Sequence, residues 1–167
     1  NIAWKINTTG AFAWYENDST INAPIYGALY NGFAVNNSAG ICPTGWHVPT
    51  DCDWMYLENT LGMSTSSQDS TGWRGTNEGG MLKDTNTVYW NSPNTGATNS
   101  SGFTGLPGGY RYVTGSYGTI GYNGFWWSSS MNNANSLWDR TLYSPNSTIN
   151  RFNHNKENGF SVRCIKD

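Results

Sequence analysis

The residues best suited to chemistry in this 167-residue chain are three cysteines and two histidines. Cys42, Cys52 and Cys164 allow at most one intrachain disulfide and leave one thiol over. His47 and His154 lie far apart in the sequence without metal-ligand spacing, so the sequence does not favour a zinc site. The chain also lacks GxSxG, Walker and HExxH motifs, which disfavours hydrolase and nucleotide-binding functions.

The surroundings of the two histidines and of one polar loop limit what they can bind. His47 lies in GWHVP, among apolar and turn residues, and we expect it to be buried with its hydrogen bonds satisfied. His154 falls on a predicted solvent-facing strand surface, where hydrogen bonding to a ligand and plain exposure both stay open. The loop NSPNTGATNSSGF offers amide and carbonyl oxygens but no carboxylate, which predicts weak ion affinity. We expect no cofactor, and a structural calcium ion elsewhere is left open.

The stretch from Phe125 to Asp167 predicts the elements that would carry a binding surface. Side chains alternate in character from Leu137 to Tyr143 and again from Thr148 to His154, as in β-strands, with turn-forming residues between the two runs. The pattern predicts a hairpin with one anchored face and one open face. Asn is depleted in strands, yet it supplies 8 of the 28 residues from 131 to 158. The alternative is a solvated loop region between core strands.

We assign two sets of residues to the stretch from Phe125 to Asp167. We expect a scaffold set to anchor the fold: Trp126, Trp127, Trp138, Leu142, Ile149, Phe160 and Val162. We expect a contact set to meet a ligand: Met131, Asn133, Asp139, Thr141, Tyr143, Asn150, Phe152 and His154. Tyr143 and Phe152 would be the aromatic anchors of that contact set.

The rest of the chain predicts short elements in one domain. Two short strands are expected in residues 1–15, and a short helix is expected after Pro24, where Tyr26, Leu29, Tyr30 and Phe33 have helical spacing. A second helix is predicted from Asp51 to Leu61, because Thr50 and Asp53 fit a capping box and Gly62 fits a C-cap. Residues 63–80 read as an irregular excursion, and residues 103–127 as short strands and turns. The fold class is therefore α+β, with two short helices and many short, mostly antiparallel strands.

Composition narrows the class of protein. Charged residues make up 12% and aromatic residues 15%, and Tyr, Trp, Ser, Gly and Asn are the residues that binding surfaces use. A net charge of -2 without a basic stripe gives no support for nucleic-acid binding. No segment has the apolar length of a membrane span, so direct membrane insertion is not expected. The low share of charged residues and the possible use of a disulfide suit an extracellular setting.

Four segments, CPTGWHVPTDCDW, LPGGYR, FWWSSS and NGFSVRCIKD, resemble in the same order the major paralogous domain family of Fibrobacter succinogenes. WHVPTDCDW and NGFSVRC are also similar to the formylglycine-generating and sulfatase-modifying factors, whose fold is a variant of the C-type lectin fold. The resemblance implies a single C-type-lectin-like domain over residues 1–167. It also implies a Cys42–Cys164 disulfide, because both positions look typical of the family. Cys52 departs from the family's usual small residue, and we expect a free, packed thiol.

The ending GFSVRC is similar, too, to the variable proteins of diversity-generating retroelements, in which adenines of a template are randomised. Asn codons are rich in adenine, so residues 131–158 fit such a variable region. The resemblance implies a non-enzymatic domain on a cell or virion surface that binds a protein or glycan ligand on another cell or surface. An ordinary binding member of the family that is not diversified is an equally open interpretation. The oligomeric state is open too.

Three alternatives stand beside that reading. The chain could be a passive structural module of a large surface protein. Calcium-dependent carbohydrate binding is disfavoured, because the EPN, QPD and WND motifs of sugar-binding C-type lectins do not occur. A copper-type thiol oxidase is the least favoured, because it needs two close cysteines upstream of the terminal motif and residues 126–159 contain none.

Overall fold

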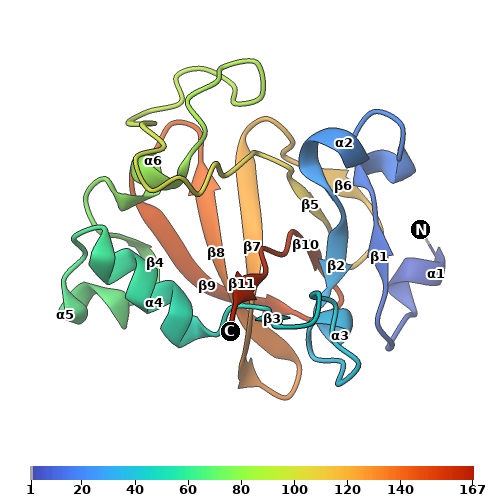
Figure 1. Cartoon of the computed structure of the whole chain (residues 1–167). Helices are drawn as coiled ribbons and strands as arrows, with labels where there is room; N and C mark the ends of the chain where they lie inside the picture. Colours follow the sequence, from blue (N-terminus) through green and yellow to red (C-terminus); the bar gives the residue numbers. More distant parts are fainter. Residues whose placement is uncertain (1) are drawn as a thin grey trace.

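A four-stranded antiparallel sheet forms the centre of the fold, in the order β4–β9–β8–β7. The structure is a computed structural model that describes residues 2–167. The strands are β4 (Gly72–Arg74), β7 (Asn123–Asn133), β8 (Ser136–Tyr143) and β9 (Ile149–Asn155). The predicted hairpin is confirmed, since β8 and β9 pair from Ser136↔Asn155 to Thr141↔Asn150. Figure 1 shows these strands side by side in the middle of the molecule.

Two smaller sheets complete the β-structure. A five-stranded sheet has the order β1–β2–β10–β5–β6, and β11 pairs with β3 in a two-stranded sheet. All named strand pairs are antiparallel. The strands are β1 (Phe12–Ala13), β2 (Leu29–Asn31), β3 (Trp46–His47), β5 (Tyr110–Arg111), β6 (Tyr117–Gly118), β10 (Gly159–Phe160) and β11 (Ile165–Lys166). An α+β fold with mostly short antiparallel strands is therefore confirmed.

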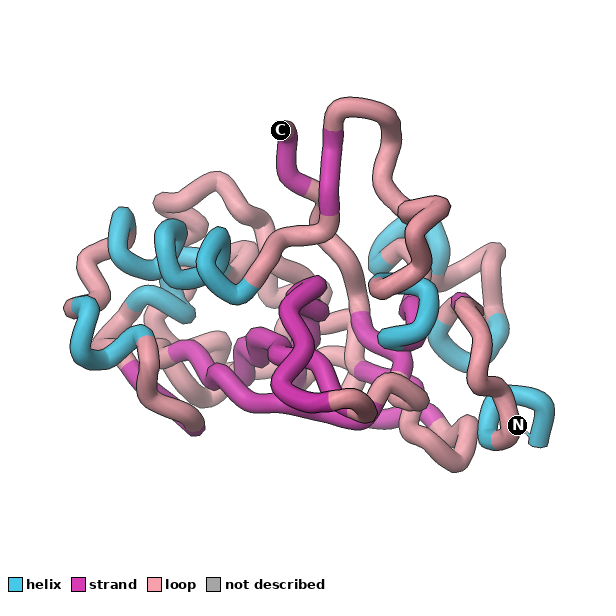
Figure 2. The backbone as a smooth tube through the Cα atoms, turned by 90° about the horizontal axis from the view of Figure 1, so that it is seen from below, coloured by secondary structure: helices cyan, strands magenta, loops and turns pink. Residues whose placement is uncertain are grey.

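The helices are short and gather at the two ends of the molecule. They are α1 (Ile2–Lys5), the 3-10 helix η1 (Tyr15–Asn17), α2 (Ala23–Tyr26), α3 (Gly32–Val35), α4 (Asp51–Thr60), α5 (Thr65–Gln68) and α6 (Glu78–Leu82). Figure 2 shows helices at both ends with the strands between them. In Figure 1, α4 and α5 lie beside the four-stranded sheet, whereas α1, α2 and α3 lie beside the five-stranded sheet.

The helix predicted over residues 51–61 is confirmed. The Thr50 side chain accepts from the Asp53 backbone N–H, and the Asp53 side chain accepts from the Thr50 backbone N–H, which completes the capping box. The helix ends at Thr60, one residue early, and Gly62 follows with φ 110°, a conformation that glycine adopts without strain. The local capping signals therefore predict the first residue of α4 correctly and its last residue to within one position.

Four local predictions were wrong. The helix expected after Pro24 is interrupted, because α2 ends at Tyr26 and Leu29–Asn31 forms β2 before α3 begins. The Asn31 side chain accepts from Ala34 N–H and so caps a new helix start there. Ile2–Lys5 is a helix rather than a strand, although Phe12–Ala13 is a strand as expected. More than two helices form, and residues 63–80 contain α5, β4 and the start of α6.

Two apolar clusters surround the central sheet. One packs against α4 and contains Trp54, Met63, Leu82, Trp90, Trp126, Leu142 and Ile149. The other contains Val35, Val48, Trp127, Leu137 and Phe160. The scaffold set is confirmed as buried for Trp126, Trp127, Leu142, Ile149 and Phe160, whereas Trp138 and Val162 are only half-buried.

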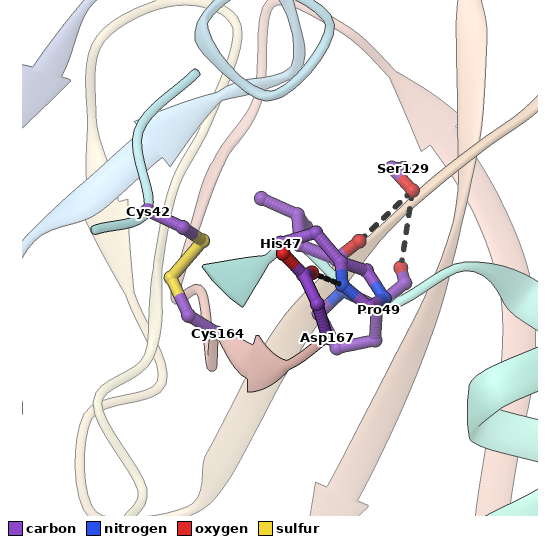
Figure 3. Close-up of a disulfide and its surroundings, with 7 residues drawn as sticks. Cys42, His47, Pro49, Ser129, Cys164 and Asp167 are labelled. Atoms are coloured by element: carbon purple, nitrogen blue, oxygen red, sulfur yellow. Dashed lines mark hydrogen bonds and ion pairs between the residues drawn. A yellow bond between two sulfur atoms is a disulfide. The ribbon is translucent and has the colours of Figure 1, made fainter. Parts of the chain in front are cut away.

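A disulfide joins the C-terminal segment to the loop before β3. The bond links Cys42 to Cys164 with their Cα atoms 5.8 Å apart, as the family resemblance implied. Beside it, Ile165 pairs with His47 in the two-stranded sheet, and Ser129 of β7 donates to the Val48 carbonyl (Figure 3). The end of the chain is therefore held to β3 by both covalent and hydrogen bonds.

Two expectations about single residues in this region were wrong. The side chain of His47 is 42% exposed rather than buried, because β3 and β11 form a separate small sheet. Its Nδ1 donates to Asp167 Oδ1 over 2.6 Å, and its Nε2 lies 3.5 Å from Asp53 Oδ2 (Figure 3). Cys52 is free as expected, but it is exposed on α4 rather than packed.

The His47–Asp167 pair predicts a pH-dependent attachment of β11. The hydrogen bond with Asp167 raises the pKa of His47 above its ordinary 6.5. A raised folded-state pKa means that the stabilisation is full below pH 6.5 and is lost as the pH rises through the folded pKa. We expect the melting temperature of the wild type to exceed that of His47→Asn at about pH 5.5 and to converge with it at about pH 9. A difference that stays the same across this range would contradict the pairing.

Candidate functional site

The candidate site is the side of β4, β9 and β8 that faces away from α4, which we call the open face. Directly paired residues of neighbouring strands point to the same side of a sheet, and successive residues alternate sides. Trp73, Asn150 and Thr141 form one row across the three strands, and Phe152 lies beside Asp139 in the next row. The opposite parity, with Arg74, Arg140 and Arg151, points toward α4.

A buried ionic network fixes the side of the sheet that faces α4. Glu58 accepts from Arg74 Nη2 over 2.6 Å and from Arg140 Nε over 2.5 Å. Asp51 accepts from Arg140 Nη1 over 2.7 Å and from Arg151 Nη2 over 2.6 Å. Two carboxylates of α4 thus hold one arginine from each of β4, β8 and β9, which makes the backbone behind the open face a rigid support.

The surroundings of Asp51 favour the ionised form of its carboxylate in the folded state. Burial acts to raise the pKa of Asp51, but the hydrogen bonds from Arg151 and the charge of Arg140 outweigh it and hold the pKa below its usual value. Alternation along residues 137–143 gives Arg140 the same parity as Trp138 and Leu142 of the scaffold set, but it does not identify the partners of Arg140. Glu58 is 82 positions away from Arg140, and nothing in the local pattern announced the pair.

Buried Lys83 holds the turn that joins β8 to β9. Its Nζ donates to the carbonyls of Thr95, Tyr143, Ser144 and Asn146 over 2.8–3.2 Å. Burial lowers the pKa of Lys83 to about 8, so the ammonium group is charged at neutral pH. In the loop over residues 91–103, for which weak ion affinity was predicted, the Thr95 carbonyl accepts from this ammonium group. Within residues 2–167, no cluster of three or more His, Cys, Asp and Glu side chains could hold a metal ion.

Three large rings lie on the open face and reach solvent. Trp73 is 44% exposed, Tyr143 is 36% exposed and Phe152 is 47% exposed. The ring centroids of Trp73 and Tyr143 are 6.1 Å apart, and those of Phe152 and His154 are 5.4 Å apart. Asn150 is half-buried between the rings in the register of the sheet. The structure therefore brings Tyr143, Asn150, Phe152 and His154 of the contact set together on one surface.

Asp139 and Thr141 are corrections to the contact set. Both point to the predicted side, but Asp139 is 0% exposed and Thr141 is 5% exposed. β8 is flanked by β7 and β9, so Asp139 lies between Trp127 and Phe152, and Thr141 lies between Phe125 and Asn150, all of them larger side chains. Asp139 accepts from His154 Nδ1 over 2.7 Å and from Thr141 Oγ1 over 3.3 Å. Burial raises the pKa of Asp139 against the effect of the His154 hydrogen bond.

The Asp139 hydrogen bond gives His154 a defined orientation. Since Nδ1 is directed at the buried carboxylate, Nε2 is the ring nitrogen left for a ligand. Met131 and Asn133 lie elsewhere, in the exposed end of β7 next to the β7–β8 turn. These two residues extend the contact set beyond the ring cluster rather than belonging to it.

Comparison with known proteins settles the family. The family model of the Fibrobacter succinogenes major domain matches residues 3–166. The chain belongs to the Fibrobacter succinogenes major domain family. Searches of curated proteins and of solved structures returned no significant match.

In this Fibrobacter succinogenes major domain, two features of the open face were missed by sequence reasoning. Trp73 sits in a Ser-, Thr- and Gly-rich stretch, and its strand has only three residues, too few for a visible alternation. Next to His154 lies a cleft of about 170 Å³, which Tyr110, Tyr112 and Phe125 help to line. In the sequence, the only sign of this cleft was the series of aromatic residues separated by glycines in residues 103–127. The residues that complete its lining include His154 of β9 and Phe160 of β10.

Over residues 2–167, the helices are all too short or too polar to cross a membrane.

Proposed function

We propose that this Fibrobacter succinogenes major domain is a non-enzymatic recognition domain that binds a protein or glycan ligand through its open face. The observation that carries the proposal is the exposure of Trp73, Tyr143 and Phe152 on a sheet whose other side is buried against α4. Exposed Trp and Tyr give large contact area at low conformational cost, and such rings dominate binding energies. The side of these strands that faces α4 carries the buried arginine network, and the three exposed rings take no part in it.

Polar groups between the rings support the same proposal. Asn150 is half-buried beside Trp73 in the register of the sheet, so its amide is part of the same surface as the rings. His154 offers its Nε2 beside Phe152. Rings flanked by amide and imidazole groups suit a ligand with both apolar and hydroxyl or amide surfaces, which describes protein and glycan ligands alike.

The finer parts of the proposal concern fold type, variation and location. We assign the domain a C-type-lectin-like fold of the formylglycine-generating-enzyme variant, with residues 131–158 as a region open to diversification by a retroelement. The exposure of Tyr143 and Phe152 supports such a region, and the burial of Asp139 and Thr141 removes these two from it. The disulfide supports an extracellular, cell-surface or virion-surface location. A neighbouring reverse transcriptase gene and a repeat of codons 131–158 that differs at adenines would identify diversification.

The alternatives have less support. An oxidase needs a reactive cysteine pair, whereas Cys42 is bonded to Cys164 and Cys52 stands alone. Calcium-dependent sugar binding needs several carboxylates at the site, whereas Asp139 is buried and bonded to His154. A passive structural module does not need neighbouring exposed rings, whereas the centroids of Trp73 and Tyr143 lie 6.1 Å apart on the open face.

Ring-removal variants test the proposed function. Labelled wild-type domain is first screened on a glycan array and on intact bacterial cells to find a ligand. We then expect Tyr143→Ala and Phe152→Ala each to weaken binding by about 2 kcal/mol, roughly thirtyfold, with little loss of stability. Phe12→Ala is the matched control, because Phe12 is an exposed ring on β1, outside the open face. Open-face variants that bind as tightly as Phe12→Ala would overturn the assignment.

A further inference from the structure

A second pocket lies away from the open face, between α4, the loop that carries Phe103 and the C-terminal segment. We call it the α4 pocket. Its volume is about 320 Å³, within the range of small-molecule sites, which is roughly 300 to 1,000 Å³. Trp54 and Leu57 of α4 form part of its lining together with Phe103, and the charged residues that line it are Asp53 and Arg163. None of these residues belongs to the contact set of the open face.

The apolar part of the α4 pocket is preformed. The ring centroids of Trp54 and Phe103 are 5.6 Å apart, and Phe103 packs edge-on against Trp126 at 5.4 Å. Trp54 and Trp126 are buried in the core cluster under α4, and Leu57 and Phe103 pack against that cluster while staying partly exposed. A flat or branched apolar group would therefore meet rings that the core already holds in place.

The two charged residues of the α4 pocket differ in the polar partners that they already have within the domain. Asp53 Oδ2 accepts from Thr50 N–H over 2.8 Å and from Thr50 Oγ1 over 2.6 Å, and it lies 3.5 Å from His47 Nε2. Arg163 lies over the Phe103 ring at 4.9 Å and donates one N–H to the Phe103 carbonyl over 3.0 Å. Within residues 2–167, no carboxylate forms an ion pair with Arg163. Arg163 is therefore the charged residue of the lining whose guanidinium has N–H groups left for an anionic ligand.

We propose that the α4 pocket binds a small carboxylate with a single aromatic or branched aliphatic body. The body would stack on Trp54, Leu57 and Phe103, and the carboxylate would accept from the remaining N–H groups of Arg163. Guanidinium groups bind carboxylates in a planar, often bidentate geometry, which gives both charge and shape selectivity. This site is independent of the ligand on the open face, so either can exist without the other.

The test uses the whole domain and a matched pair of probes, 3-phenylpropionate and its neutral amide. We expect a nuclear magnetic resonance titration with the acid to shift the Trp54 indole N–H and backbone amides of α4, with a dissociation constant on the order of millimolar or tighter. The amide should bind about tenfold more weakly or worse, because it lacks the charge-assisted contact. This comparison needs no variant.

Variants then locate the anion. Arg163→Met should reduce affinity for the acid to that for the amide, whereas Lys166→Met, which removes an exposed positive charge one residue from the pocket lining, should leave it unchanged. Tyr143→Ala should also leave it unchanged, which separates the α4 pocket from the open face. No shifts at α4, equal binding of acid and amide to the wild type, or undiminished binding to a folded Arg163→Met variant would each overturn the proposal.

Discussion

Glu58→Gln should lower the free energy of unfolding by about 3 to 5 kcal/mol, a large part of the roughly 5 to 15 kcal/mol that holds a typical domain. Glu58 is fully buried and accepts from both Arg74 and Arg140. Glutamine keeps the shape but has one carbonyl oxygen and no charge. Three buried guanidinium groups would then share the single carboxylate of Asp51. Urea denaturation followed by circular dichroism measures the loss.

Arg140→Met gives the matched comparison for this network. Removing Arg140 leaves one carboxylate for each remaining arginine, because Glu58 keeps Arg74 and Asp51 keeps Arg151. We therefore expect Arg140→Met to cost less than Glu58→Gln, although it deletes more hydrogen bonds. If Arg140→Met were the more damaging change, charge balance would not be what stabilises the network.

Removing the disulfide should produce a loss of similar size. Cys42 and Cys164 close a loop with a sequence separation of 122, and the chain-entropy model gives about 5 kcal/mol for a loop of that length. The double variant Cys42→Ser with Cys164→Ser should therefore melt far below the wild type, as should the wild type under a reducing agent. Thermal melts followed by circular dichroism measure both effects.

Cys52→Ser is the control for the disulfide, because Cys52 is an exposed free thiol and should not affect melting. The loss should be greatest at the C-terminal segment, where β11 pairs with the short strand β3 next to the disulfide. A double variant that melts with the wild type would show that the bond contributes little to folding.

Local signals explain the parts of the fold that the sequence predicted. The capping box of Thr50 and Asp53 predicts α4, and the alternation from Leu137 to Tyr143 predicts β8, because both depend on neighbours in the chain. The same spacing rule failed at residues 26–33, where Asn31 joins β2 and also caps α3. There, contacts of Asn31 with Thr9 and Ala11 outweigh the helical pattern.

Long-range neighbours explain what the sequence left out of the site. Alternation correctly assigns Asp139 and Thr141 to the side of Tyr143, but it does not reveal that larger side chains of β7 and β9 flank and bury them. Trp73 joins the site only because β4 pairs with β9 across 77 positions at Trp73↔Asn150. Register between distant strands has no local signature, so the covering of residues and the extra ring both needed the structure.

The exposed residues of the open face are free to vary because folding does not use them. A display library that randomises Trp73, Tyr143, Asn150 and Phe152, compared with one that randomises Asp139, Arg140, Thr141 and Arg151, tests this most directly. We predict that most members of the first library stay folded, judged by protease resistance, and yield binders to new targets, whereas most members of the second unfold. Equal loss of folded members in both libraries would contradict the account.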